Sequence, residues 1–280
     1  MHIPVLLKEA IDALAVRAGG TYVDATFGAG GHTRAILERL GPKGRVIAVD
    51  VDPTVHARAD LPDDSRLKLV HSNFRELSQL GLEAVDGVLF DLGVSSMQFD
   101  TPERGFSLSA DAPLDMRMDP SHGQTAAEYI ERTSERELAD VIFTLGEERS
   151  ARKIARAIKQ RHPKTTGDLA RIVSAAVHQR GKRERIHPAT RTFQALRIAV
   201  NDELAALEEG LEAATTMLRP GGRLVAIAFH SLEDRIVKNA IRSDSRLRAI
   251  TRKPIVPSEE ERTRNPRSRS AKLRVAERLG

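Results

Sequence analysis

Short apolar runs separated by glycine, proline and polar residues mark the first hundred positions of the chain. Such runs predict buried strands, here at 21–27, 45–52, 66–74 and 85–94. Apolar residues at helical spacing follow the first run from His32 to Leu40, and a short helix is expected at Thr54–Asp60. Strand, helix and strand in series predict an α/β fold with a parallel, doubly wound sheet.

The alternation breaks after the fourth expected strand. The next convincing strand is 222–229, and so long a connection is unusual in this kind of fold. Helical spacing fills 135–161 and 166–180, and residues Thr190 to Leu218 predict one long helix ending before Pro220. We therefore expect a discontinuous α/β domain of residues 1–103 and 187–280, a last strand within 270–279, and an inserted helical domain of residues 104–186.

Charge is distributed unevenly over the 280 residues. The net charge is +5, and residues 241–280 hold twelve Lys or Arg against five Asp or Glu. A second basic run, HQRGKRERIHPATR, occupies 178–191. Basic segments on a near-neutral body indicate either a polyanionic partner, most often nucleic acid, or a solvated surface.

Several classes of site are disfavoured. The chain has no cysteine, which excludes disulfides, and its nine histidines show no metal-ligand spacing such as HExxH, so no metal is expected. The N-terminal residues lack the pattern of a signal peptide, and no stretch reaches the length of a membrane span. We expect a cytoplasmic protein without a membrane partner.

Polar residues stand where each expected strand ends. The first strand leads through Asp24 into Gly28-Ala29-Gly30-Gly31-His32, the second ends at Asp50, and the fourth ends at Asp91. The third leads into Ser72-Asn73-Phe74, which could hold a purine. Ligands of open α/β sheets lie beyond the carboxyl ends of the strands, so these residues are the candidate site.

The glycine cluster restricts the ligand. A dinucleotide fingerprint needs glycine where this chain has Thr33, and no Gly-Lys-Ser/Thr follows as in a P-loop. S-adenosylmethionine fits better, because it requires close backbone approach, a carboxylate for the ribose and a sandwich for the adenine. The pattern therefore favours a methyl donor over the NAD of an oxidoreductase.

Seven motifs carry a resemblance to a known family. They are DATFGAGGHT, DLGVSSMQFD, RGFSL, PLDMRMD, HPATRTFQALRIAVNDEL, FHSLEDRIVK and NPRSRSAKLRVAER. With these the chain resembles the bacterial 16S rRNA cytosine-N(4) methyltransferases over its whole length. The resemblance implies a Rossmann-like class I methyltransferase fold with an inserted helical domain that helps to recognise RNA. It also implies a donor site made of Gly30, Gly31, His32, Asp50, Phe74, Asp91 and Gln98, of which Gln98 rests on the family alone.

Two roles stay open for Asp91. It could accept a hydrogen of the cytosine amine and so assist attack on the methyl group, or it could bind only the amino group of the donor. Other amine-directed methyltransferases have an aromatic residue shortly after this position, which is missing here, so the stacking ring would come from Phe99, Phe106 or Phe229. His230 is a weaker catalytic candidate. The motif FHSLED is interpreted as a helix capping box over S-x-x-D rather than as part of a hydrolase triad.

The expected partner is 16S rRNA or the small ribosomal subunit, and homodimerisation is left open. Candidate phosphate-binding residues are Lys182, Arg183, Arg185, Arg191, Arg197, Arg264, Arg267 and Arg269. Two further alternatives are a DNA amine methyltransferase and a ribosome-assembly factor that binds the donor without turnover.

Overall fold

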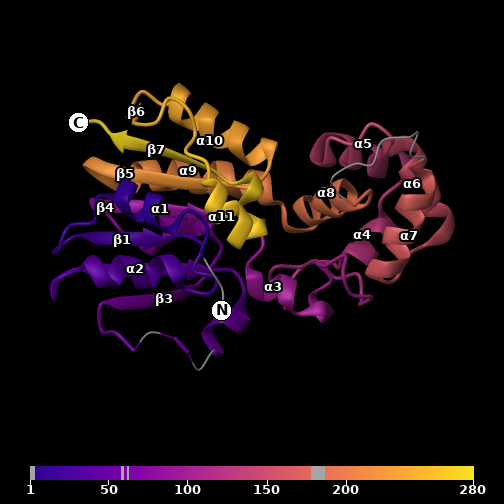
Figure 1. Ribbon diagram of the computed structural model, residues 1–280, viewed down its shortest axis with the longest axis horizontal. Coiled ribbons are helices and arrows are strands. Elements are labelled where there is room, and N and C mark those ends of the chain that lie inside the picture. The colour runs from indigo at the N-terminus through magenta and orange to yellow at the C-terminus, as the bar shows by residue number, and fades with distance from the viewer. Residues whose placement is uncertain (1–3, 58–59, 62, 178–186) are drawn as a thin grey trace. The chain divides into compact units, whose positions relative to one another are not determined.

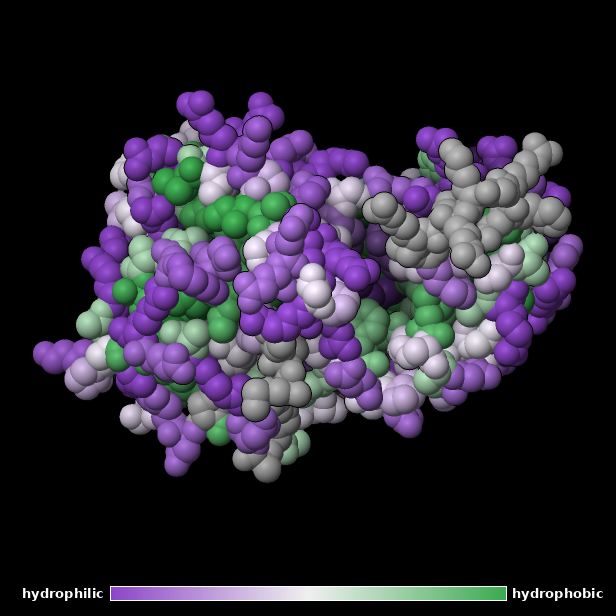
Figure 2. Space-filling model, viewed as in Figure 1, coloured by the Kyte–Doolittle hydropathy of each residue, from purple (hydrophilic) through white to green (hydrophobic). Residues whose placement is uncertain are grey.

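The computed structural model describes residues 4–57, 60–61, 63–177 and 187–280. The described chain divides into two compact units, one of residues 1–93 and 204–280 and the other of residues 94–203 (Figure 1). Hydrophilic residues predominate on the face seen in Figure 2, with hydrophobic ones gathered in smaller patches. In the described ranges, no helix combines the length and the apolar character needed to cross a lipid bilayer.

The first unit is built on a 7-stranded sheet in the order β3-β2-β1-β4-β5-β7-β6. Its strands are β1 Thr21–Asp24, β2 Arg45–Asp50, β3 Leu67–His71, β4 Val85–Asp91, β5 Leu218–Ala228, β6 Leu247–Ala249 and β7 Lys272–Arg278. Strands β1 to β5 pair in parallel, whereas β7 runs antiparallel to both β5 and β6. The predicted α/β class and its parallel sheet are therefore confirmed.

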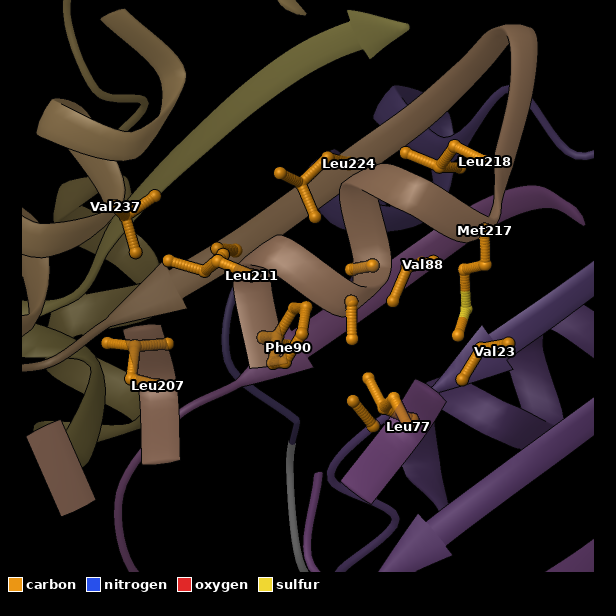
Figure 3. Close-up of a cluster of buried hydrophobic side chains, with 14 of the residues drawn as sticks. Val23, Leu77, Val88, Phe90, Leu207, Leu211, Met217, Leu218, Leu224 and Val237 are labelled. Carbon is orange, nitrogen blue, oxygen red and sulfur yellow. The ribbon is translucent and has the colours of Figure 1, made fainter. Parts of the chain in front are cut away.

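Both faces of this sheet are buried. Along β4, Val88 and Phe90 join the core that includes Leu207, Leu211 and Val237 (Figure 3). Leu89 between them joins the core on the opposite face, as the two-residue period of a strand requires. The helices of the unit are α1 Leu7–Leu14, α2 Gly31–Arg39, α9 Glu203–Met217, α10 Ser231–Ser243 and α11 Glu259–Arg264, with short 3-10 turns η1 Pro53–Ala57, η2 Phe74–Leu80 and η4 Pro266–Ser270. The two buried faces explain why the strands read as continuous apolar runs.

The second unit is helical in its regular elements. It contains α3 Ser96–Asp100, η3 Pro102–Arg104, α4 Ala126–Arg132, α5 Glu135–Gly146, α6 Ala151–Arg161, α7 Thr166–Ala176 and α8 Thr190–Asn201. Its own core includes Ile142 of α5, Ile154 and Ile158 of α6, Leu169 of α7 and Leu196 of α8. The compact unit runs from 94 to 203, beyond the expected 104–186 at both ends, because Val94 packs against this core at one end and α8 contributes to it at the other.

Three local expectations were wrong. The long helix expected over Thr190–Leu218 is two helices, α8 and α9, separated by Asp202 in the left-handed region at φ 50°. Among the described residues of the expected Thr54–Asp60 helix, the structure has the 3-10 turn η1, and the short strand β6 was not expected. Asp tolerates the left-handed region better than most residues, so the break needs no glycine or proline to signal it.

Candidate active site

Three carboxylates end adjacent parallel strands of the first unit. Asp24 ends β1, Asp50 ends β2 and Asp91 ends β4, and β1 pairs in parallel with both β2 and β4. Carboxyl ends of parallel neighbours meet at one edge of a sheet, which here is also the edge where the glycine loop leaves β1. The structure thus brings together the acids that the sequence singled out.

The glycine loop is a tight turn held by Asp50. Gly28 and Gly30 have φ of 51° and 77°, in the left-handed region that glycine adopts without steric cost. A Cβ on Gly30 would lie 2.6 Å from the Phe27 ring. The Gly28 N–H donates to Asp50 Oδ2 at 2.6 Å, so the second strand fixes the loop that follows the first.

The N-terminal segment packs against the end of this loop. A Cβ on Gly31 would lie 2.2 Å from the Pro4 ring, so only glycine allows this contact. The buried His32 ring places Nε2 at 3.2 Å from the Val5 carbonyl and Nδ1 at 3.4 Å from Asp91 Oδ2. Because a carbonyl only accepts, Nε2 carries the proton, and a neutral ring then offers Nδ1 as an acceptor towards Asp91.

Two threonines connect Asp24 to its neighbours, Thr33 through its hydroxyl and Thr26 through its backbone N–H. The Thr33 hydroxyl donates to Asp24 Oδ2 at 2.6 Å, and the Thr26 N–H donates to Asp24 Oδ1 at 3.2 Å. The Thr26 hydroxyl in turn accepts the Asp91 N–H at 2.6 Å. Sequence reasoning missed both roles. For Thr33 a signal was available, because a hydroxyl residue stands in place of the third glycine, nine positions after a buried acid.

Asp50 retains free acceptor positions. Its carboxylate accepts the N–H groups of Gly28 and Asp52 at 2.6 and 2.9 Å, which uses two of about four lone-pair sites. Burial raises the pKa of Asp50 to about 6, and the two backbone hydrogen bonds oppose that rise. The remaining positions suit hydroxyl donors such as those of a ribose.

Asp91 is the most perturbed acid of the site. Burial, followed by the negative charges of Asp24 and Glu233, raises the pKa of Asp91 to about 8. Its Oδ1 atom is buried and has no hydrogen-bond partner among the described residues. A protonated Asp91 is complementary to the neutral His32 ring, and the unsatisfied Oδ1 suits a ligand that brings an N–H group or a positive charge.

His230 caps the helix that follows β5, which corrects the expected capping box. The box is formed one position earlier than S-x-x-D, between His230 and Glu233: the His230 ring accepts the Glu233 N–H at 3.3 Å, and Glu233 Oε2 accepts the N–H groups of Phe229 and His230 at 2.7 and 3.1 Å. The other ring nitrogen lies 3.0 Å from Glu233 Oε1. The cap thus uses Nδ1 of His230, whereas its buried Nε2 has no hydrogen-bond partner among the described residues. Glu233 is a site residue that the sequence reasoning did not single out.

Phe74 and Gln98 lie in different units. Phe74 begins η2, with its ring edge-on to Phe90 at 5.8 Å and against Gly210, where a Cβ would lie 2.9 Å from it. Gln98 belongs to the helical unit, where its side-chain oxygen accepts the Ser95 N–H at 2.9 Å in the capping box of α3. Of the aromatic candidates, Phe106 is buried in the helical core, Phe99 is 37% exposed and Phe229 is half-buried.

The expected phosphate-binding residues differ in how far they are engaged. Lys182, Arg183 and Arg185 lie outside the described residues. Arg197 makes a two-bond ion pair with Glu203 at 2.7 and 2.8 Å and is only 14% exposed. Weaker pairs join Arg191 to Glu148 at 3.7 Å and Arg264 to Glu260 at 3.9 Å, while Arg267 and Arg269 are exposed on η4.

Comparison with known proteins decides the family. A model of the MraW methylase family matches residues 1–279. The chain belongs to the MraW methylase family. It is 53% identical over 292 residues to the ribosomal RNA small subunit methyltransferase H of Acidobacterium capsulatum, covering 99% of this chain and 98% of that protein. It is 51% identical over 293 residues to the protein of the same name from Koribacter versatilis, covering 99% and 94%.

Family membership confirms the resemblance carried by the seven motifs. A solved structure of a Clostridium thermocellum protein, provisionally described as an rRNA-methylase, matches with a TM-score of 0.50 at 15% identity and covers 100% of both chains. At that identity the match bears on the fold alone. This MraW methylase has the expected class I methyltransferase fold, with the helices α4 to α8 inserted between β4 and β5.

Proposed function

We propose that this MraW methylase transfers the methyl group of S-adenosylmethionine to the exocyclic amine of a cytosine in the decoding region of 16S rRNA. The observation that carries the proposal is the buried, unpartnered Oδ1 of Asp91 beside a glycine loop. Membership of a methylase family and about half-identity to two ribosomal RNA small subunit methyltransferases H give the acceptor class.

The residues at the strand ends fit the methyl donor. Gly28 and Gly30 leave the backbone of the loop without side chains, Asp50 has acceptor positions for ribose hydroxyls, and Phe74 begins the turn after β3 with a ring that suits the adenine. The Oδ1 of Asp91 suits a cationic or N–H-bearing group. Gly31, His32 and Gln98 complete the proposed set, in which Gly31 and His32 act through the loop and its contacts with Pro4 and Val5.

When bound, S-adenosylmethionine supplies a methyl group on a sulfonium, which is already activated for displacement. The protein's own contribution is to hold the cytosine amine in line and to receive its proton. Ionised Asp91 accepts an amine hydrogen, which directs the nitrogen lone pair towards the methyl carbon, and takes up the proton once the new C–N bond has formed and the C–S bond has broken. A pKa of about 8 lets Asp91 exist in both forms near neutral pH.

A methylation assay with separate acceptors tests the activity. Purified protein and labelled donor are incubated with small subunits and with naked 16S rRNA from cells that lack this methylation, and nucleosides are identified by mass spectrometry. We expect N4-methylcytosine from ribosomal substrate. Product formed on duplex DNA instead would point to a DNA amine methyltransferase, and donor binding without product on any acceptor would point to an assembly factor.

The two roles of Asp91 separate in the Asp91→Asn variant. If Asp91 receives the amine proton, kcat falls by at least about a hundredfold, a typical contribution of a general base, while donor affinity changes little. If Asp91 only binds the donor, the dissociation constant of S-adenosylmethionine rises and kcat at saturation is retained. Titration with S-adenosylmethionine gives the dissociation constant of the donor, and single-turnover methylation gives the rate of the chemical step.

RNA recognition by the helical unit and self-association are parts of the proposal that need their own measurements. The Lys and Arg residues of the insertion suit contact with phosphates. Sedimentation of the free protein reports its oligomeric state. The helical unit comprises residues 94–203, and RNA cross-linking to this segment tests whether it contacts the substrate.

A further inference from the structure

Helix α6 carries a concentrated positive charge. Between Arg149 and Lys164 the chain has seven Lys or Arg and no Asp or Glu. The helix buries Ala151, Ile154, Ala155 and Ile158, at the i, i+3, i+4 and i+7 spacing of one face. The opposite side presents Arg152, Lys153 and Arg156, all exposed, with exposed Arg149 just before the helix. We call these four residues the α6 basic face.

Most of the charge on the α6 basic face is not neutralised by the part of the chain that the structure describes. Arg149, Arg152 and Lys153 make no ion pair with any of the described residues, and Arg156 has one exposed pair with Glu135 at 3.4 Å. Lys159, by contrast, donates to three backbone carbonyls around the end of α4 and so has a structural role. Arg197, one of the residues expected to bind phosphate, is held by Glu203. The α6 basic face is therefore the better candidate for an external anion.

The position of this charge disfavours the helix itself. In the same unit α4, α5 and α7 each have an acidic residue in the first turn, as the helix dipole favours, whereas α3 and α8 have none. Helix α6 has none there, and places Arg152 and Lys153 in its first turn instead. The Ser150 side chain before it makes no capping hydrogen bond. Residues that lower the stability of their own helix, with no neighbouring contact that offsets the loss, are expected at functional surfaces.

We propose that the α6 basic face binds backbone phosphates of the rRNA substrate. The inference rests on the proposed function and adds the surface that holds the RNA. Arg152 and Arg156 lie about one helical turn apart on α6, a rise of about 5.4 Å, comparable to the separation of successive phosphates along a strand, and Lys153 follows Arg152 directly. Arginine can grip a phosphate with two parallel hydrogen bonds. Such contacts position the RNA and carry no base specificity, which stays with the site around Asp91.

A matched pair of charge reversals in the full-length protein tests the surface. The first variant is Arg152→Glu/Lys153→Glu, and the control is Lys43→Glu/Arg45→Glu, which changes the net charge equally at the amino end of β2, away from the strand ends of the site. For the first variant we expect an increase of about tenfold in KM for 16S rRNA or the small subunit, with kcat at saturation and donor affinity unchanged. Loss of about two phosphate contacts would also reduce the salt dependence of RNA binding by a slope of roughly 1.5.

The outcomes separate this inference from the proposed function. If the wild-type protein binds rRNA but methylates nothing, the proposed function fails, while filter binding still tests the surface. Unchanged RNA affinity and salt slope in the α6 variant would overturn the inference, as would an equal loss in the control, because only net charge would then matter. Glutamate in the first turn suits the helix dipole, so α6 should still fold, and Arg152→Gln/Lys153→Gln gives a neutral second variant with a smaller effect in the same direction.

Discussion

Thr33 donates a hydrogen bond of 2.6 Å to Asp24, and neither side chain has measurable exposure to solvent. This bond ties the first turn of α2 to the last residue of β1 across the glycine loop. A dinucleotide-binding loop would have glycine in place of Thr33, for close packing of helix on strand. In this protein the Thr33 hydroxyl replaces that contact and holds the carboxylate of Asp24. Burial of this carboxylate raises its pKa to about 6.

Replacing Thr33 by Val should loosen the loop. Thr33→Val keeps the volume but removes the hydroxyl, and Asp24 then loses a buried donor, so we expect a loss of about 1–3 kcal/mol in the free energy of unfolding. Donor affinity should fall as well, because the loop is less well fixed. Urea unfolding and donor titration measure the two effects. Thr33→Ser retains the donor and serves as control; equal losses in both variants would show that the methyl group, and not the hydrogen bond, matters.

Asp91 should make the free protein less stable as the pH rises. Its folded-state pKa of about 8 lies above the ordinary aspartate value of 3.8, so the folded state binds more protons than the unfolded state between these two pH values. The contribution of Asp91 to the free energy of unfolding is fully present below about pH 4, and it is lost as the pH rises through about 8. Asp24 and Asp50 each have a pKa of about 6, so they add to the loss of stability only as the pH rises to about 6.

The Asp91→Asn variant isolates this contribution. It stays neutral, so its unfolding free energy should vary less than that of the wild type between about pH 6 and 8, and the variant should be the more stable protein at pH 8.5. Urea unfolding at five pH values from 5 to about 9 tests this. Parallel curves for the two proteins would refute the raised pKa.

Glu233 should set the pH at which methyl transfer begins. Its negative charge is one cause of the raised pKa of Asp91, so Glu233→Gln should shift the rising limb of kcat/KM to lower pH, by less than about one unit because burial is the larger cause. The amide oxygen of Gln still accepts the N–H groups of Phe229 and His230. Exposed Glu38→Gln on α2 is the control, and a profile that moves equally in both variants would exclude the local effect.

Gly30 should not tolerate alanine. At φ 77° an L residue is strained, and the added Cβ would meet the Phe27 ring at 2.6 Å, so Gly30→Ala should cost about 1–3 kcal/mol of stability and weaken donor binding at least tenfold. Gly19→Ala is the matched control, because its Cβ would meet nothing within 4 Å. Calorimetric unfolding and donor titration provide the readouts; full affinity in Gly30→Ala would contradict the tight turn.

The sequence predicted the parts of the site that follow from strand periodicity. Asp24, Asp50 and Asp91 were found because each ends an apolar run, and parallel pairing then brings them together. The hydroxyl of Thr26 could not be assigned in this way, because its partner, the Asp91 N–H, lies 65 positions away in the chain. Gln98 rested on family resemblance, since nothing in its own neighbourhood points to a ligand.

Helix limits were predicted less well where a single backbone angle decides them. The pattern of apolar residues continues through Asp202, and only its left-handed conformation separates α8 from α9. His230 was missed as a cap because serine and aspartate are the usual signals, and S-x-x-D lies one position later. In both places the competing conformations differ by little energy, so packing in the folded protein decides.

Insertion of the helical unit between β4 and β5 orders the events of biosynthesis. The central strand β4 has its partner β1 as soon as the N-terminal third emerges, but its other neighbour β5 follows only after α8 and α9 have been made. Until then one edge of β4 offers unpaired backbone groups and apolar side chains to other nascent chains. Rapid folding of the insertion around its own core would shorten the effective length of chain between β4 and β5. The rate at which the helical unit folds should therefore govern the yield of active enzyme during synthesis on the ribosome.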